Sequence, residues 1–130
     1  MNEPRQNISS GGPWEDRVGY PRAVRVGPHV HVSVCTAMTP SGLVGAGDPY
    51  AQARQAIETI RLALAQAGAS LSHVVRTRIY VVDIAAWPEI ARAHAEAFAA
   101  TRPAATMVQV AALIDPTLLV EIEADAYLPA

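Results

Sequence analysis

The polar side chains with the clearest chemical potential stand at every second position of three short segments. They are His29, His31, Ser33 and Cys35; Arg76, Arg78 and Tyr80; and Glu121, Glu123 and Asp125. Successive side chains of a β-strand point to opposite faces, so each set would share one face of a sheet. The pattern is typical of a solvated sheet face, or of a subunit interface on which arginines and glutamates pair.

Two other chemistries would need rarer arrangements. The imidazoles of His29 and His31 could chelate zinc with Glu121 or Glu123 as a third ligand. Histidines at surfaces or interfaces are commoner, and we predict no metal. Cys35 would need a neighbouring base and a lowered pKa to act as a nucleophile. We predict a small buried or interface thiol instead.

The spacing of apolar residues and the positions of glycine and proline predict the helices and strands that position these residues. Residues 1–21 contain three prolines and three glycines, which predicts an irregular N-terminal arm. The predicted strands are 22–26, 29–36, 74–82, 104–110 and 118–127. The predicted helices are 49–67, capped by Asp48 and ended by Gly68, and a second from Pro88 to just before Arg102. This order predicts an α+β fold in which one mixed or mostly antiparallel sheet carries both helices on one face.

The phase of each strand predicts which side chains the helices cover. The covered set is Val30, Val32 and Val34; Val75, Thr77, Ile79 and Val81; Thr106, Val108 and Val110; and Val120, Ile122 and Ala124. The alternate residues, including Ala105, Met107 and Gln109, are predicted on the opposite face. The inner side of the second helix is predicted to carry Ile90, His94, Ala97 and Phe98. His94 is expected to pack near Trp87, although it could also reach a ligand cleft as an acid–base group.

Bulk composition places the chain among single soluble domains. It has 130 residues, of which 51% are hydrophobic and 17% charged, which suffices for one core. A net charge of −2 gives no basic stripe, so we predict no nucleic-acid partner. No long apolar run is present and the single cysteine excludes an intrachain disulfide. We therefore expect neither a signal peptide nor a membrane partner, and a cytoplasmic location.

Several dispersed strings resemble the RidA/YjgF family of reactive intermediate deaminases. They are GYPRAVRVG, VSVCTA, AQARQAIETIRLAL, AGASLSHVVRTRIYV, DIAAWPEIARAHAEAF and RPAATMVQVAALIDPTLLVEIEA, and they span roughly residues 17–127. The PWE string that precedes the first strand resembles one subgroup of the family. The resemblance implies a chorismate-mutase-like fold, with an N-terminal arm over 1–21 and a RidA-like domain over 22–130.

The resemblance also implies an assembly and a chemistry. Three chains would form a homotrimer with sheets inward and helices outward, and small-molecule pockets would lie in the clefts between subunits. The best-known members hydrolyse reactive enamines and imines to keto acids and ammonia without a cofactor. Others are described as endoribonucleases or translation inhibitors. We therefore expect no cofactor, with the chain itself and a small molecule as partners.

Three positions of the family's site are retained in this sequence. Glu121 matches the glutamate that positions the attacking water, Tyr20 matches a tyrosine at the pocket mouth and Ser33 matches a serine beside the pocket. Structural interpretations remain open for two of them. Glu121 could instead pair with Arg76 or Arg78 across neighbouring strands, and Tyr20 could be a packing aromatic.

Four positions depart from the family's pattern. Ala105 stands where an arginine would hold a substrate carboxylate through two hydrogen bonds, and Met107 stands in place of a cysteine. Val34, next to Cys35, replaces a glycine, and Ala91 on the second helix replaces an asparagine. All four changes run from polar or permissive to apolar. The sequence thus predicts a ligand less anionic than an amino-acid-derived imine.

Three hypotheses of function follow. The first is a diverged RidA-like pocket that binds or acts on a neutral or apolar imine, enamine or enol, by hydrolysis, water addition or proton transfer at Glu121. The second is an imine deaminase whose arginine is relocated to Arg78 or Arg92. The third is a non-catalytic trimeric protein that binds partners or acts like a chaperone. A ribonuclease fits least, because the chain is slightly acidic and shows no aromatic-basic platform.

Overall fold

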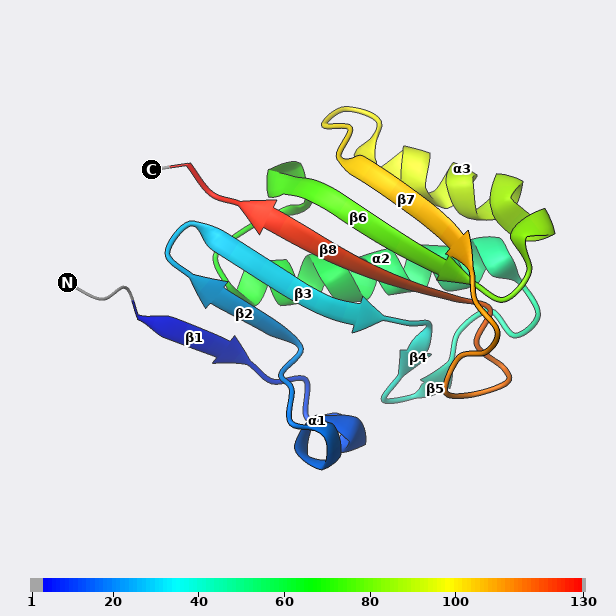
Figure 1. Ribbon diagram of the computed structural model, residues 1–130, viewed down its shortest axis with the longest axis horizontal. Helices are drawn as coiled ribbons and strands as arrows, with labels where there is room; N and C mark the ends of the chain where they lie inside the picture. Colours follow the sequence, from blue (N-terminus) through cyan, green and yellow to red (C-terminus); the bar gives the residue numbers. More distant parts are fainter. Residues whose placement is uncertain (1–3, 130) are drawn as a thin grey trace.

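A mixed six-stranded sheet and two long helices form the two layers of the structure (Figure 1). The computed structural model describes residues 4–129. Within that range the strands are β1 (Arg5–Ile8), β2 (Ala23–Val26), β3 (His29–Cys35), β4 (Met38–Thr39), β5 (Gly42–Leu43), β6 (Val74–Val81), β7 (Ala104–Gln109) and β8 (Val120–Tyr127). The helices are α1 (Pro13–Val18), α2 (Pro49–Gln66) and α3 (Trp87–Phe98), with short 3₁₀ turns at Leu71–His73 and Ile84–Ala86.

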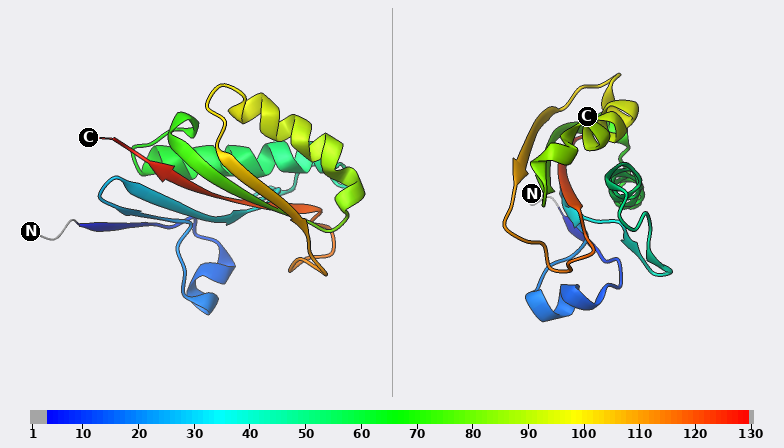
Figure 2. Two further views of the ribbon diagram at one scale, coloured as in Figure 1. Left: turned by 45° about the horizontal axis from the view of Figure 1, so that its top comes forward. Right: turned by 90° about the vertical axis from the view of Figure 1, so that its right-hand side faces the viewer.

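The strand order of the main sheet is β1-β2-β3-β8-β6-β7, and β4 and β5 form a separate hairpin. β6 and β7 run parallel and are joined through α3, because a parallel pair needs a crossover connection. The other neighbouring pairs are antiparallel. Both α2 and α3 cover one face of the sheet, whereas α1 lies apart from them on the connection between β1 and β2 (Figure 2). The predicted architecture of one mixed sheet with two covering helices is confirmed.

The predicted helix 49–67 is confirmed as α2. The Asp48 carboxylate caps it by accepting the backbone N–H of Ala51 at 3.1 Å. The buried face of α2 includes the predicted stripe of Ala53, Ile57, Ile60 and Leu64. Gly68 follows with a φ of 81°, the left-handed conformation in which many helices end. Every helix within residues 4–129 is too short or too polar to span a bilayer.

The prediction of an irregular arm over 1–21 is wrong for two segments. β1 pairs antiparallel with β2 at the sheet edge, and Ile8 is buried opposite Ala23. α1 is tied back to the chain because its buried Glu15 carboxylate accepts hydrogen bonds from two preceding serines. A four-residue strand with one buried side chain carries too little alternation to be recognised in a sequence. Residues 1–3 lie outside the described range.

Two register shifts move side chains to faces that simple alternation does not predict. Between Val32 and Cys35 the pairing of β3 with β8 slips, so Cys35 lies in the core and Val34 is only half-buried. A second shift at the start of β6 buries Val74 and leaves 53% of Val75 exposed. The predicted faces of Val34, Cys35 and Val75 are therefore wrong. The physical reason is that an extra residue at a β-bulge reverses the phase of the strand.

The faces predicted for β7 are inverted. Its parallel register with β6 pairs the core residue Ile79 with Met107, which places Met107 on the helix-covered side. The side chains on that side are Ala105, Met107 and Gln109. Thr106 and Val108, which were predicted to be covered, are exposed on the other side. β7 is an edge strand with apolar residues on both faces, so its hydrophobic pattern does not specify a phase.

A buried amide fixes the loops at one end of the sheet to α2. Gln52 is fully buried; its amide nitrogen donates to the carbonyls of Gly45 at 3.2 Å and Thr117 at 3.1 Å. Its amide oxygen accepts the backbone N–H of Leu119 at 2.9 Å. Gly45 permits this close approach, because a Cβ there would lie 2.7 Å from the Ala51 Cβ. The segment leading into β8 is thus anchored through one side chain.

We predict that Gln52→Leu lowers the free energy of unfolding by about 2–4 kcal/mol, because buried backbone groups lose their partners. Gln55→Leu is the matched control. Gln55 lies on the same helix, and within residues 4–129 its side chain makes a single hydrogen bond, to the Thr59 hydroxyl at 3.4 Å. Its replacement should change stability by less than about 0.5 kcal/mol. Urea unfolding of both variants checks this, and equal losses would contradict the anchoring role of Gln52.

Candidate functional site

The row of carboxylates on β8 lies on the sheet face away from the helices, here called the polar sheet face. Glu123 accepts a hydrogen bond from the Tyr80 hydroxyl of β6. Asp125 lies between two basic side chains, with Arg78 Nη1 at 3.1 Å and His31 Nδ1 at 2.7 Å. Glu123 and Asp125 are therefore both bound by side chains of neighbouring strands, and for Asp125 and Arg78 this is the pairing expected for opposed charges in a sheet.

Glu121 differs from the other two carboxylates. It is half-buried and makes no ion pair or hydrogen bond through its side chain to residues 4–129. The alternative in which it pairs with Arg76 or Arg78 is not observed, because Arg78 bonds Asp125 and Arg76 donates to the Thr106 hydroxyl at 3.2 Å. Burial, followed by the neighbouring Glu123 carboxylate, raises the pKa of Glu121. A carboxyl group with a raised pKa is suited to general acid–base work near neutral pH.

A small pocket of about 240 Å³ lies between α3 and β7 on the helix-covered side. It brings together four residues singled out in the sequence, namely Ala91, His94, Ala105 and Met107. Ile79 and Ala95 add to its apolar lining, and no arginine contributes to it. A carboxylate placed here would lose its hydration without gaining a charged donor from the pocket.

His94 is the titratable group of this pocket. Its Nε2 lies 2.8 Å from the Thr77 Oγ1, and its ring packs 4.7 Å from the Phe98 ring. Burial lowers the pKa of His94, so the imidazole is neutral at pH 7. Thr77, which fixes this ring, is a fully buried polar residue. Its role was missed in the sequence analysis, where it counted as one more residue of the covered face.

The remaining sequence-predicted residues surround the entry to β2 and the end of β3. Ser33 donates from its hydroxyl to the carbonyl of Pro21 at 2.9 Å, directly beside Tyr20 in the chain. Arg22 Nη1 donates to the carbonyl of Val34 at 2.8 Å. The Nε of Arg22 is buried and has no acceptor within residues 4–129. A buried donor in this state is one that a ligand or another chain can satisfy.

Arg22 was not recognised in the sequence. The sequence feature that could have identified it is its position, directly after the Tyr-Pro turn that leads into the first predicted strand. Its guanidinium also approaches Cys35, with Nη1 3.4 Å from Sγ. Burial nevertheless raises the pKa of the Cys35 thiol to about 11, so a reactive thiolate is not formed at neutral pH.

The two arginines proposed as substitutes lie elsewhere. Arg78 is on the polar sheet face, paired with Asp125. Arg92 is exposed on α3, and its guanidinium carbon lies 3.6 Å from the centre of the Tyr50 ring on α2. Neither contributes to the pocket that contains Ala105 and Met107. The hypothesis that one of them replaces the missing clamp is therefore not supported by their positions.

The zinc alternative gains no third ligand in the structure. The His29 and His31 rings stack with centroids 6.4 Å apart, and His31 contacts Asp125. Within residues 4–129, no group of three or more His, Cys, Asp or Glu side chains is arranged to hold a metal ion.

The sheet separates the two most reactive features of the chain. Glu121 lies on the polar sheet face, whereas the pocket with His94 lies on the helix-covered side at the β7 edge. One chain therefore does not bring Glu121 and His94 to the same small ligand. A site using both would take Glu121 from one copy and the pocket from another.

Comparison with known proteins gives concordant matches over most of the chain. Residues 14–128 match the family model described as Endoribonuclease L-PSP. The crystal structure of Rv2704 from Mycobacterium tuberculosis, described as a member of the YjgF/YER057c/UK114 family, is 52% identical, with a TM-score of 0.88 over 96% of this chain and 100% of that chain. Uncharacterized protein SCO2049 of Streptomyces coelicolor is 37% identical over 97% of this chain and 94% of that protein. The 3-aminoacrylate deaminase RutC of Acinetobacter baylyi is 41% identical over 65% of this chain and 67% of that protein.

We predict that Glu121→Gln stabilises the protein at neutral pH but not in acid. A carboxyl whose pKa is raised on folding stabilises the native state below its unfolded pKa and loses that contribution as pH rises through the folded pKa. The variant should therefore unfold at a higher temperature than the parent at pH 7, with the difference vanishing below about pH 4. Thermal unfolding across this range is the measurement, and a pH-independent difference would contradict the raised pKa.

The neighbouring carboxylate provides a control. Because the Glu123 carboxylate is the second cause of the raised pKa, Glu123→Gln should lower the pKa of Glu121 without restoring its ordinary value. Carbon NMR titration of the side-chain carboxyl groups in both proteins measures this.

We also predict slow alkylation of Cys35. A thiol pKa of about 11, against 9.0 for a free thiol, implies roughly 100-fold less thiolate at pH 8. Iodoacetamide should accordingly react about 100-fold faster in urea than with the native protein. The chain has one cysteine, so the label reports on this residue alone. Equal rates would show that Cys35 is accessible and reactive.

Proposed function

Since this chain belongs to the Endoribonuclease L-PSP family, also called YjgF or RidA, we propose that it uses a RidA-type pocket between subunits of a homotrimer. The proposed ligand is a reactive imine, enamine or enol of neutral or apolar character. A relative named as a 3-aminoacrylate deaminase supports a small reactive metabolite as the ligand class. Under this proposal the chain is a diverged member of the family and not a standard deaminase of amino-acid-derived imines.

The observation that carries the proposal is the apolar pocket beside α3. Ala105 lies in it at the position where the family resemblance puts the carboxylate-binding arginine, next to Met107 and Ala91. A bidentate guanidinium is the usual means of holding a carboxylate, and the pocket contains none. Its one titratable side chain, His94, is neutral at pH 7. A neutral ligand with an apolar body fits these surroundings better than an anion.

The proposal of an assembled site rests on the two faces of the sheet. Apolar side chains remain exposed on the polar sheet face, including Val26 at 38%, Val108 at 42% and Tyr127 at 44%. A face that combines such residues with ion pairs is suited to contact with other copies of the chain. Contact there would let Glu121 of one subunit approach the pocket of its neighbour.

In the proposed reaction, Glu121 acts as the base. Its raised pKa lets it accept a proton from water that adds to a C=N or C=C bond, and then return that proton to the nitrogen or the neighbouring carbon. With an imine, the carbinolamine so formed would then break its C–N bond as Glu121 passes the hydroxyl proton to the nitrogen, which releases ammonia and a carbonyl compound. His94 would hydrogen-bond a polar atom of the ligand, since its ring is already oriented by Thr77. Neither step requires a cofactor.

A guanidinium placed in the pocket tests the proposal directly. We predict that Ala105→Arg binds 2-oxobutyrate about ten- to a hundredfold more tightly than the parent, because two charge-assisted hydrogen bonds to the carboxylate become available. Ala65→Arg adds the same charge at an exposed position of α2 and should leave the affinity unchanged. Isothermal titration of the three proteins gives the comparison. Micromolar binding of 2-oxobutyrate by the parent would refute the proposed preference for neutral ligands.

The catalytic part of the proposal is tested by ammonia release. Hydrolysis of enzymatically generated 2-aminoacrylate and of bulkier, uncharged imines is followed with the parent and Glu121→Ala. Acceleration is expected for uncharged imines and should disappear in the variant. Absence of acceleration with every imine would favour the third hypothesis, a non-catalytic trimeric binding protein.

A further inference from the structure

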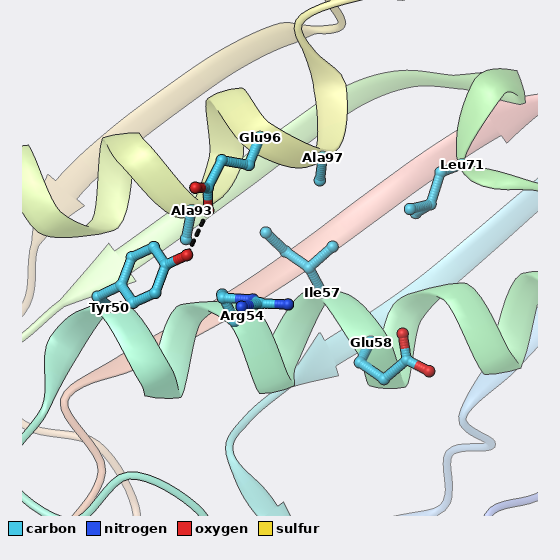
Figure 3. A pocket seen from close by; sticks show the side chains of 8 residues that line it. All are labelled: Tyr50, Arg54, Ile57, Glu58, Leu71, Ala93, Glu96 and Ala97. Carbon is cyan, nitrogen blue, oxygen red and sulfur yellow. Dashed lines mark hydrogen bonds between the residues drawn. The ribbon is translucent and has the colours of Figure 1, made fainter.

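A second and larger hollow lies between α2 and α3, on the helical layer and away from the sheet (Figure 3). Its volume is about 390 Å³, within the range of sites that hold small organic ligands. Tyr50 and Glu96 bridge the two helices at one end, and Leu71 lies at the other (Figure 3). None of the site residues named above lines this groove.

The floor of the groove is apolar. Ile57 and Ala93 face it from the two helices and are only 5% and 2% exposed. Ala97 and Leu71 extend the same surface and are half-buried against the core. Contact with a hydrocarbon or aromatic body would remove this surface from water, which is favourable in proportion to the area covered.

The carboxylates on the rim already have partners. The Tyr50 hydroxyl donates to Glu96 at 2.5 Å, which joins the two helices. Glu58 accepts two hydrogen bonds from Arg61, at 2.8 and 2.5 Å. Both carboxylates on the rim therefore have hydrogen-bond partners within the chain, and Glu58 is also paired with a cation.

Arg54 is the contrasting group. Its side chain lies along α2 between Tyr50 and Glu58 (Figure 3), and within residues 4–129 it makes no ion pair and no hydrogen bond. Its guanidinium carbon is 5.8 Å from the Tyr50 ring centre, while that of Arg92 is 3.6 Å away from the same centre. Arg54 is therefore the one guanidinium among the residues that line the groove, and it is the only charged group of that lining without a hydrogen-bond or ion-pair partner within residues 4–129.

We propose that the groove between α2 and α3 is a second ligand site, which binds an amphiphilic anion. The apolar body of the ligand lies on Ile57, Ala93 and Ala97, and its carboxylate or sulfonate meets the free guanidinium of Arg54. A neutral hydrophobic ligand would leave Arg54 unpaired, and a small inorganic anion would leave the floor uncovered. Neither would use both features.

This site is distinct from the pocket of the proposed function. α3 forms a wall of both hollows, with Ala91 and His94 facing one of them and Ala93 and Glu96 facing the other. The two sites therefore offer opposite recognition chemistry on the two sides of a single helix. The proposal does not depend on any catalytic activity of the chain.

The test uses two fluorescent probes with the same aromatic body, the anion anilinonaphthalene sulfonate and the neutral N-phenylnaphthylamine. Titration of the folded protein should show saturable binding of the anion, tighter than that of the neutral probe. Arg54→Ala should weaken the anion about fivefold, the upper range for an exposed ion pair, and leave the neutral probe unchanged. Arg5→Ala removes the same charge from an exposed position on β1 and should change neither affinity.

A matched pair of larger side chains locates the probe. Ala97→Phe fills the groove and should abolish binding of the anion, whereas Ala105→Phe fills the other pocket and should not. Far-UV circular dichroism and thermal unfolding show whether each variant is folded, and the arginine pair gives the answer if a phenylalanine variant is not. The proposal fails if the anion does not saturate, if Arg54→Ala leaves its affinity unchanged, or if binding is lost in Ala105→Phe alone.

Discussion

The alternation of side chains along β8 is the constraint on which the rest of the structure depends. This strand is hydrogen-bonded on both edges, and its residues Val120, Ile122, Ala124 and Ala126 are buried in the core. Because successive side chains point to opposite faces, that burial forces three carboxylates into a row on the other face. Neighbouring strands supply partners for Glu123 and Asp125. Glu121 has no such partner within residues 4–129, and its pKa is raised by burial and by the adjacent carboxylate.

Side chains also alternate between the two faces along β7, and this places the apolar pocket on the side of the sheet opposite Glu121. The β6–β7 register turns Ala105 and Met107 toward α3, on the side opposite Glu121. In one chain the sheet stands between the carboxyl group and the apolar pocket. Because of this separation, a reaction that uses both Glu121 and the apolar pocket requires two copies of the chain.

The helices cover one face of the sheet, and they also hold neighbouring segments in place. The buried amide of Gln52 holds the first turn of α2 against the segment that leads into β8. On α3, the small side chains Ala91 and Ala93 leave room for a hollow on each side of the helix. One hollow has a neutral histidine at its wall and the other has an unpaired guanidinium at its rim, so the two differ in the ligands that they would favour.

The sequence by itself determined the two helices, the order of the five strands that it revealed and the polar character of one sheet face, because these follow from periodicity and local capping. It also singled out Glu121 and Ala105, through a family resemblance that the comparisons support at the level of the family. Only the tertiary structure decided the faces of Cys35, Val75 and Met107. Those faces depend on two bulges and on the register of an edge strand, which arise from pairing between distant segments. The tertiary structure also decided that the side chains of Glu121 and Arg54 have no ion-pair partner within residues 4–129, because folding determines which groups become neighbours.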